Sequence, residues 1–328
     1  MGLIEKLEEI KTKLENYNPG GSSGGDDWEI TYPAYLFYYG LRSGETKTEL
    51  LKKMKNCKPI YYNTFGYYTT EEDIEVDINY MIENHYTKND YYGDKYKYAI
   101  LQNMFSSSNL TNITLNLKDK DTILMLGNTF TSSKKLISVN SNADIIKTNY
   151  IPYIFKDCSL LEHINFTIDV NGCLSAANAF QNCAKLKEVI LTGRLIPTYI
   201  PYSTSPYKDL SNMYNTSTNY CTIANMFNGC SSLEKIIGLD ITNIGNITTA
   251  FSNCTSLKTL DFSGTENVQV NIDLKTTGLD ATGLMNMLNT LPDISNSTSR
   301  TLTIGSTKLA LLTDEQIAEF NMKGYSLA

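Results

Sequence analysis

The sequence predicts an elongated α/β repeat protein, a solenoid in which short strands form a parallel β-sheet and the ends are covered by capping units. Two observations support this prediction. Phenylalanine recurs with three consecutive spacings of 25 residues, one of 47 and one of 24, at Phe105, Phe130, Phe155, Phe180, Phe227 and Phe251. Several columns around these phenylalanines also agree between copies. Self-similarity at a fixed period is typical of chains whose units bury their apolar residues by stacking on neighbouring units.

The columns indicate how each unit folds. Three places after the Phe stand Ser108, Ser133, Cys158, Cys183, Cys230 and Cys254, and two places before it stand Asn103, Asn128, Tyr153, Asn178, Asn225 and Thr249. A leucine column follows at Leu110, Leu136, Leu161, Leu186, Leu233 and Leu257, with an aliphatic residue three places later. A Leu-x-x-aliphatic run fits a short strand stacked about 4.8 Å from the next one. The segment around the Phe would then be a turn or short helix on the opposite wall, with the small residue at a tight corner.

The clearest copies read Met226-Phe227-Asn228-Gly229-Cys230-Ser231-Ser232-Leu233 and Ala250-Phe251-Ser252-Asn253-Cys254-Thr255-Ser256-Leu257. Over roughly residues 100–265 they resemble the BspA-type leucine-rich repeat, whose units typically read Ala-Phe-x-x-Cys-x-x-Leu-x-x-Ile. The first two copies depart from that pattern by carrying Ser in place of Cys. The resemblance implies a leucine-rich-repeat solenoid. That family is mostly found on microbial surfaces and is associated with adhesion and binding.

Composition excludes several classes of partner. The chain of 328 residues has a net charge of −7 and a pI near 5.0, with no Lys/Arg-rich run, so we expect no nucleic-acid binding. No run of about 18 apolar residues occurs, so we expect no membrane insertion. The N-terminus is charged from its fifth residue and lacks the apolar segment of a secretory signal. We therefore expect the protein to stay in a cytosol or to leave it by another route.

The sequence nominates no catalytic or metal site. Seven cysteines are present, and four share one repeat column, where a free Cys behaves as a small buried hydrophobe; a disulfide framework is the alternative. No Cys-x-x-Cys pair occurs, and the two histidines are His85 and His163, so we expect neither a metal nor a cofactor. Nucleotide-binding and hydrolase motifs do not occur, and we expect no enzymatic activity. A carboxylate pair for glycoside cleavage stays open, although nothing nominates one.

Residues 1–18 predict an amphipathic helix for docking or oligomerisation, and residues 19–27 a flexible Gly/Ser linker. The apolar positions alternate steps of four and three, as in a short coiled coil, at Leu3, Leu7, Ile10, Leu14 and Tyr17. The helix would either dock on its own domain or a partner, or associate with copies of itself. Leu at one seam position and Ile at the other weakly favour a coiled coil of three or four helices, and we favour a trimer.

Residues 28–99 are rich in tyrosine, and we interpret them as an N-terminal cap because the open end of a solenoid must be covered. A tyrosine-rich contact platform for proteins or sugars is the alternative. Within this segment the spacing of Ile74, Ile78 and Ile82 predicts a helix over about 70–84.

Two parts of the repeat region at 100–265 carry candidate ligand contacts. An insertion at 193–220 is rich in Pro and Tyr and contains Tyr199, Tyr202 and Tyr207. It is either a binding loop or a packed variant of the repeat unit. On the strands, the residues between the inward positions form a polar strip of mixed charge that includes His163, Glu188 and Lys235. This strip either binds a ligand or is simply solvated.

Residues 266–328 predict a final repeat and a C-terminal cap. Asp280 would cap a helix that ends before Pro292, residues 301–304 would form a strand, and Thr313 with Gln316 would form a capping box for a last helix closed by Gly324. This segment resembles the C-terminal capping unit of phage and prophage structural proteins that carry such repeats.

The resulting hypothesis is a non-enzymatic bacteriophage virion protein, a fibre or decoration protein for host or mucosal attachment. It would be made in the host cytoplasm, released by lysis and displayed on the virion surface. Its N-terminal helix would contact other virion proteins or form a homo-oligomer, and its repeat surface would bind a host-surface protein or glycan. The alternative is a BspA-like adhesin on a bacterial cell surface that binds a host protein or glycan.

Overall fold

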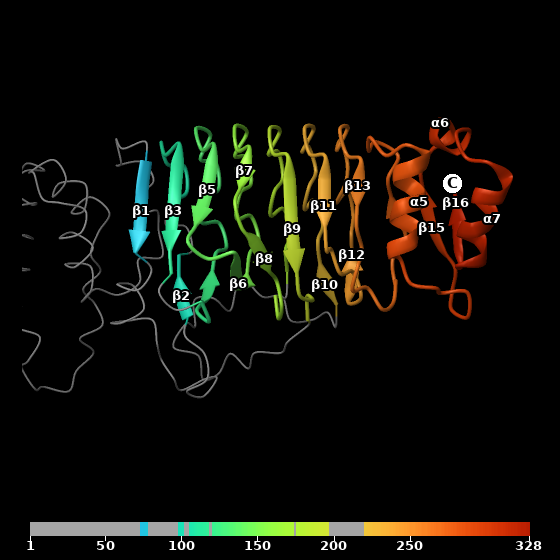
Figure 1. Ribbon diagram of the computed structural model, residues 1–328, viewed down its shortest axis with the longest axis horizontal. Coiled ribbons are helices and arrows are strands. Elements are labelled where there is room, and N and C mark those ends of the chain that lie inside the picture. Colours follow the sequence, from blue (N-terminus) through green and yellow to red (C-terminus); the bar gives the residue numbers. More distant parts are fainter. Residues whose placement is uncertain (1–72, 78–97, 102–104, 118–119, 174, 197–219) are drawn as a thin grey trace, which may run out of the picture.

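The computed structural model describes residues 73–77, 98–101, 105–117, 120–173, 175–196 and 220–328. These residues form mainly parallel β-sheets with a few helices, and the strands lie side by side along the long axis of the molecule (Figure 1). The predicted docking helix at 1–18, the linker at 19–27 and most of the tyrosine-rich segment lie outside the described residues.

Strands from successive repeat units pair with one another in two long rows. One sheet has the order β1 (Asp73–Asp77), β3 (Asn112–Asn116), β5 (Ser138–Ser141) and β7 (His163–Ile164). The other has the order β13 (Thr259–Leu260), β11 (Lys235–Ile237), β9 (Glu188–Thr192), β8 (Thr167–Asp169), β6 (Ile145–Tyr150), β4 (Ile123–Met125) and β2 (Tyr98–Ile100). The end of β9 pairs with β8 and its beginning with β11, so β9 joins the two rows. A smaller pair consists of β10 (Cys221–Thr222) and β12 (Ile244–Asn246).

The upper row of strands in Figure 1 consists of β1, β3, β5, β7, β9, β11 and β13, so it contains one whole sheet and the β9–β13 end of the other. The leucine column places the strands of this upper row from β3 to β13. All six leucines of this column are fully buried, and in each unit the strand begins two residues after the leucine. The aliphatic residue three places after the leucine is buried or half-buried on the same strand, and Ile113, Val139 and Ile164 lie opposite one another in the register. The prediction of parallel strands at these runs is therefore confirmed.

The recurring phenylalanines stack on one another through the core. Neighbouring ring centroids along the series from Phe105 to Phe251 are 5.5, 5.1, 5.8, 5.3 and 6.1 Å apart, and all five pairs are stacked. We call this series the phenylalanine ladder. Phe180 and Phe227, which are 47 residues apart in the sequence, are one of its closer pairs. The insertion between them therefore does not interrupt the ladder.

The segment around each Phe is a turn, not a short helix. Two residues before the Phe the backbone is left-handed at Asn128, Tyr153, Asn178, Asn225 and Thr249. Two residues after it the backbone is left-handed again, at Ser107, Ser132, Asp157, Asn182, Gly229 and Asn253. Asn, Asp and Gly tolerate this conformation better than other residues, which explains why they dominate both columns.

The small-residue column bonds each unit to the preceding one. The Sγ of Cys158, Cys183, Cys230 and Cys254 donates to the carbonyl oxygen of a Phe in the preceding unit at 2.9, 3.0, 3.0 and 3.1 Å. Ser133 Oγ donates to Phe105 O in the same way at 2.7 Å. Ser and Cys are interchangeable in this column because both are small and both can donate a hydrogen bond.

The helix predicted over about 70–84 is wrong where the structure describes it. Residues 73–77 form β1, with Ile74 opposite Ile113 and Val76 opposite Leu115 of β3. A spacing of four is also a multiple of two, the period of a strand, and the sequence alternates acidic and aliphatic residues here. The alternation of acidic and aliphatic residues therefore indicates the strand correctly, whereas the spacing of the isoleucines does not.

The C-terminal segment departs from the repeat and adds the helices. It contains β14 (Ile272–Asp273), α5 (Ala281–Thr290), β15 (Arg300–Thr303), α6 (Ser306–Leu309), α7 (Asp314–Met322) and β16 (Tyr325–Leu327). Strands β14, β15 and β16 form a parallel three-stranded sheet, and α7 packs against β16.

The predicted caps of these helices are confirmed. Asp280 Oδ1 accepts from Gly283 N at 2.8 Å at the start of α5, and Thr313 and Gln316 form the capping box of α7. The end of α5 before Pro292 also agrees with the prediction, but the side chain that caps this end was not predicted. There Lys323 Nζ donates to Leu288 O and Leu291 O, at 2.8 Å each. A cation at this position satisfies terminal carbonyls and complements the helix dipole.

Candidate ligand-binding surface

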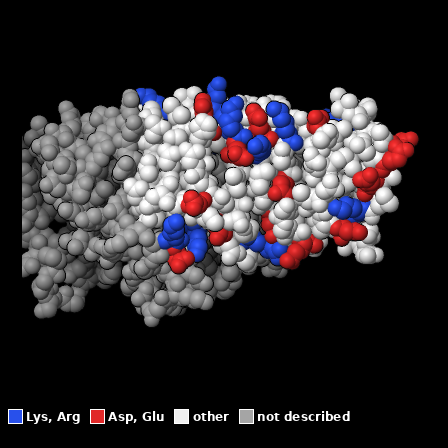
Figure 2. Space-filling model, in the orientation of Figure 1, with Lys and Arg blue, Asp and Glu red and all other residues white. Residues whose placement is uncertain are grey.

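Charged side chains and one histidine lie at the beginning of four consecutive strands of the upper row. They are Glu162 and His163 at β7, Lys187 and Glu188 at β9, Glu234 and Lys235 at β11, and Lys258 at β13. We call these residues the charged strip. Figure 2 shows basic and acidic residues interspersed over these strands. The strip arises because the two residues between the buried leucine and the aliphatic residue three places later are exposed or half-buried in each of these units.

The register brings the three predicted contact residues of this strip into one row. Lys235 lies opposite Glu188 on the neighbouring strand. Lys187 N donates to Glu162 O at 3.3 Å, which continues the same alignment from β9 to β7 and places His163 beside Glu188. Whether this row binds a ligand stays a prediction.

Opposite charges pair along the strip but stay exposed. Lys235 Nζ lies 3.7 Å from Glu188 Oε1, and Lys258 Nζ lies 3.4 Å from Glu234 Oε2. The exposed fractions of these four side chains run from 43% to 73%. Exposed pairs of this kind contribute about 0–1 kcal/mol each to stability. The ion pairs of the strip therefore contribute little to stability, and their side chains are accessible to a ligand.

The predicted contacts Tyr199, Tyr202 and Tyr207 lie outside the described residues, but both ends of their segment are described. Residues 193–196 continue the pairing of the repeat, since Gly172 N donates to Arg194 O and Ile196 N to Cys173 O, at 3.0 Å each. Asn243 of the next unit forms hydrogen bonds with both ends of this segment. Its side-chain Nδ2 donates to Leu195 O at 3.0 Å, and its backbone carbonyl oxygen accepts from Cys221 N at 2.9 Å.

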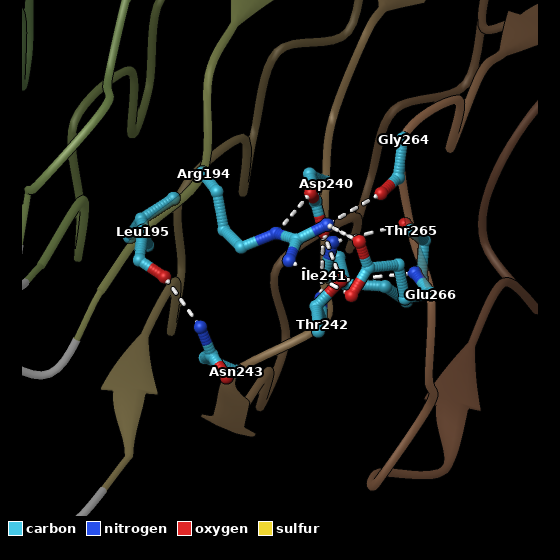
Figure 3. A network of polar contacts seen from close by, with 9 residues as sticks. All are labelled: Arg194, Leu195, Asp240, Ile241, Thr242, Asn243, Gly264, Thr265 and Glu266. Atoms are coloured by element: carbon cyan, nitrogen blue, oxygen red, sulfur yellow. Dashed lines mark hydrogen bonds and ion pairs between the residues drawn. The ribbon is translucent and has the colours of Figure 1, made fainter.

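Arg194 forms a polar network that links three units (Figure 3). Its Nε donates to Asp240 Oδ2 at 2.7 Å, its Nη2 donates to Gly264 O at 2.9 Å, and both terminal nitrogens lie 3.0 Å from the carboxylate of Glu266. The other oxygen of Asp240 accepts from the backbone and side chain of Thr242. The Asp240 side chain is 7% exposed, so the ion pair with Arg194 offsets the cost of removing its carboxylate from water.

The charges of this network stabilise one another, and we call the network the Arg194 clamp. Hydrogen bonds to Glu266 and then Asp240 raise the pKa of Arg194, and the Arg194 guanidinium in turn lowers the pKa of Glu266. The charged groups of Arg194, Asp240 and Glu266 are therefore all paired within the protein. Sequence reasoning missed this network because its members belong to no repeat column. The available signal was the rarity of arginine in a lysine-rich chain, since only arginine offers a planar fork of donors.

The described cysteines are unsuited to nucleophilic chemistry. Cys158, Cys173, Cys183, Cys221, Cys230 and Cys254 are all free and buried. Burial raises the pKa of Cys173, Cys221 and Cys254 to about 12, so these thiols stay protonated near neutral pH.

No group of three His, Cys, Asp or Glu side chains among the described residues is arranged to hold a metal ion. The Asp169 to Gly172 segment is a turn, in which Asp169 Oδ1 accepts from Asn171 N at 2.9 Å and Gly172 has a φ of +83°.

Comparison of the chain with protein-family models finds no matching family, and comparison with curated proteins finds no similar sequence. Among the described residues, no helix combines the length and apolar character that a bilayer crossing requires.

Proposed function

We propose that this chain is a non-enzymatic attachment protein, a BspA-like leucine-rich-repeat solenoid in which the charged strip is the ligand-binding face. The observation that carries the proposal is the alignment of exposed opposite charges on β7, β9, β11 and β13. A rigid row of alternating charges can match a complementary row on a partner and fix its orientation. The partner is a host-surface protein or glycan.

The particular setting that we propose is the surface of a bacteriophage virion, where the chain serves as a fibre or decoration protein. The support is the resemblance of residues 266–328 to capping units of phage structural proteins, together with the packing of α7 against the last strand, β16. Residues 1–18 would dock on other virion proteins or assemble the chain into a homo-oligomer, with a trimer favoured. The chain would reach the virion surface after synthesis in the host cytoplasm and lysis.

The second candidate is a BspA-like adhesin on a bacterial cell surface, which the repeat resemblance favours equally. Immunodetection separates the two settings. The protein should be found in purified phage particles induced from the source strain under the first proposal, and in washed cell envelopes without induction under the second.

Exchanging the charges of one ion pair tests the binding face. The double variant Glu188→Lys, Lys235→Glu keeps the net charge and the pair but inverts the local pattern. We expect its binding to host cells or mucin-coated surfaces to fall at least about tenfold, with the unfolding midpoint nearly unchanged.

The matched control is the double variant Asp121→Lys, Lys147→Asp, which exchanges an ion pair outside the strip whose two atoms are 2.6 Å apart. This control should bind like the wild type. Equal binding by the wild type and the Glu188/Lys235 exchange would remove the charged strip as the binding face.

A further inference from the structure

The turns around the phenylalanine ladder form a second face, distinct from the charged strip. Two residues before each Phe stand Asn128, Tyr153, Asn178, Asn225 and Thr249, all with φ between 53° and 59°. One residue after the six phenylalanines stand Ser106, Thr131, Lys156, Gln181, Asn228 and Ser252. We call these two columns the turn strip. Lys156 carries the only charge in it.

Tyr153 is the largest residue of its column. Three other described members are Asn, which tolerates a positive φ, and Thr249 is β-branched and Tyr153 bulky, so both are outliers at this position. Burial does not explain the tyrosine, since the residue is 37% exposed. A residue held in an unfavourable conformation at the surface points to a function for its side chain.

Tyr153, Lys156, Asn178 and Gln181 are mutual neighbours. Lys156 N donates to Tyr153 O at 3.2 Å within one turn, and Gln181 N donates to Asn178 O at 3.2 Å within the next. The two turns are aligned by backbone bonds, such as the one from Tyr153 N to Ala177 O at 3.1 Å. The four side chains therefore start from adjacent positions of two adjacent turns.

One side-chain contact and one unpaired atom characterise this cluster. Lys156 Nζ lies over the Tyr153 ring, 5.6 Å from its centre, so the two side chains form a cation–π contact. Gln181 Oε1 is buried and has no hydrogen-bond partner among the described residues. A buried amide oxygen without a donor is costly, and a hydroxyl group placed beside it would supply that donor. Because Gln181 as a whole is half-buried but its Oε1 is buried, a ligand hydroxyl reaches this oxygen only when the side chain turns outward.

We propose that this cluster is a subsite for a neutral sugar ring. The exposed part of Tyr153 offers aromatic area against which the C–H face of a hexose can pack, beside the ammonium of Lys156 that lies over the ring. The amides of Asn178 and Gln181 both donate and accept, as sugar hydroxyls do. The single ammonium of Lys156 can donate to a hydroxyl or ring oxygen. The inference does not depend on the charged strip and adds a second surface with a different ligand chemistry.

The test measures binding of the full chain to maltohexaose, cellohexaose and chitohexaose by titration calorimetry and saturation-transfer NMR. We expect at least one hexasaccharide to bind, and Tyr153→Asn to weaken that binding at least about tenfold. The same variant should unfold at an equal or higher temperature, because Asn suits the left-handed backbone. Tyr220→Asn is the matched control, since Tyr220 is 52% exposed outside the turn strip. It should bind like the wild type.

Three results would overturn the subsite. They are a failure of all three hexasaccharides to bind at millimolar concentration, equal affinity of the wild type and Tyr153→Asn, and a lower unfolding temperature of Tyr153→Asn, which would make the tyrosine structural. The Glu188/Lys235 exchange should leave hexasaccharide affinity unchanged, so this proposal and the proposed function can fail separately.

Discussion

At the scale of single residues, the small-residue column joins packing and hydrogen bonding. Cys158 and its equivalents are fully buried, yet each thiol donates to a carbonyl of the unit before it. The sequence predicts the small size but not the bond, because the acceptor lies 28 residues earlier in the chain. No local pattern reports a partner at that distance.

The first prediction compares Cys183 with Phe180. Cys183→Ser should change the free energy of unfolding by less than about 1 kcal/mol, because a hydroxyl can donate to Phe155 O as Ser133 does to Phe105 O. Phe180→Ala should cost about 3–5 kcal/mol, because it removes a ring stacked on both sides. Urea denaturation of both variants measures this ranking. An equal or reversed ranking would refute our interpretation of the two columns.

The second prediction concerns alkaline pH. The thiols of Cys173, Cys221 and Cys254 have an ordinary pKa of 9.0, which burial raises to about 12 in the folded protein. Between these values the unfolded chain loses protons that the folded chain keeps, so the free energy of unfolding falls as pH rises. The stabilisation is complete below pH 9 and decreases by up to about 1.4 kcal/mol per pH unit for each thiol.

Comparison of the wild type with Cys254→Ser isolates this effect from other groups that titrate at high pH. The urea midpoint of the variant should decrease less than that of the wild type between about pH 8 and pH 10. Parallel decreases would mean that the Cys254 thiol ionises as readily in the folded state as in the unfolded one.

At the scale of elements, the structure shows which patterns determine strands and which mislead. The leucine column predicts every upper-row strand from β3 to β13, because each inward residue repeats at a fixed place. The isoleucines at 74, 78 and 82 predict a helix, and the described part of that segment is a strand. The caps of α5 and α7 were predictable because Asp280 and Thr313 act on donors three residues away.

Contacts between distant elements could not be predicted in this way. Lys323 reaches the end of α5 from beyond α7, and Arg194 reaches residues 46 and 72 positions later. Neither lies in a periodic column. The row of His163, Glu188 and Lys235 was predictable because it follows from the strand period, whereas the cluster at Tyr153 depends on backbone dihedrals that the sequence does not display.

The third prediction tests the Arg194 clamp. Arg194→Leu should lower the free energy of unfolding by about 1–3 kcal/mol, because Asp240 would keep a nearly buried charge without its cation. Lys258→Leu should cost no more than about 0.5 kcal/mol, because its side chain is 73% exposed. Adding Asp240→Asn to Arg194→Leu should recover part of the loss. A double variant that is no more stable than Arg194→Leu would show that the charge of Asp240 is not the cause.

At the scale of the whole molecule, the fourth prediction concerns assembly. Multi-angle light scattering should find a trimer for the full chain and a monomer for a chain that starts at Asp26, if residues 1–18 assemble the protein. Monomers in both cases would make those residues a docking peptide. Oligomers in both cases would place the interface elsewhere and refute the proposed role of Leu3, Leu7, Ile10, Leu14 and Tyr17.

The continuity of the phenylalanine ladder across Phe180 and Phe227 has an evolutionary consequence. Their rings are 5.3 Å apart, and Asn243 forms hydrogen bonds with both Leu195 and Cys221, so contacts between residues outside 197–219 join the units on the two sides of that stretch. A lineage under pressure to change its target can keep these contacts while it exchanges the stretch. We expect sequence diversity among close variants of this protein to concentrate there, while the aromatic and leucine positions stay fixed.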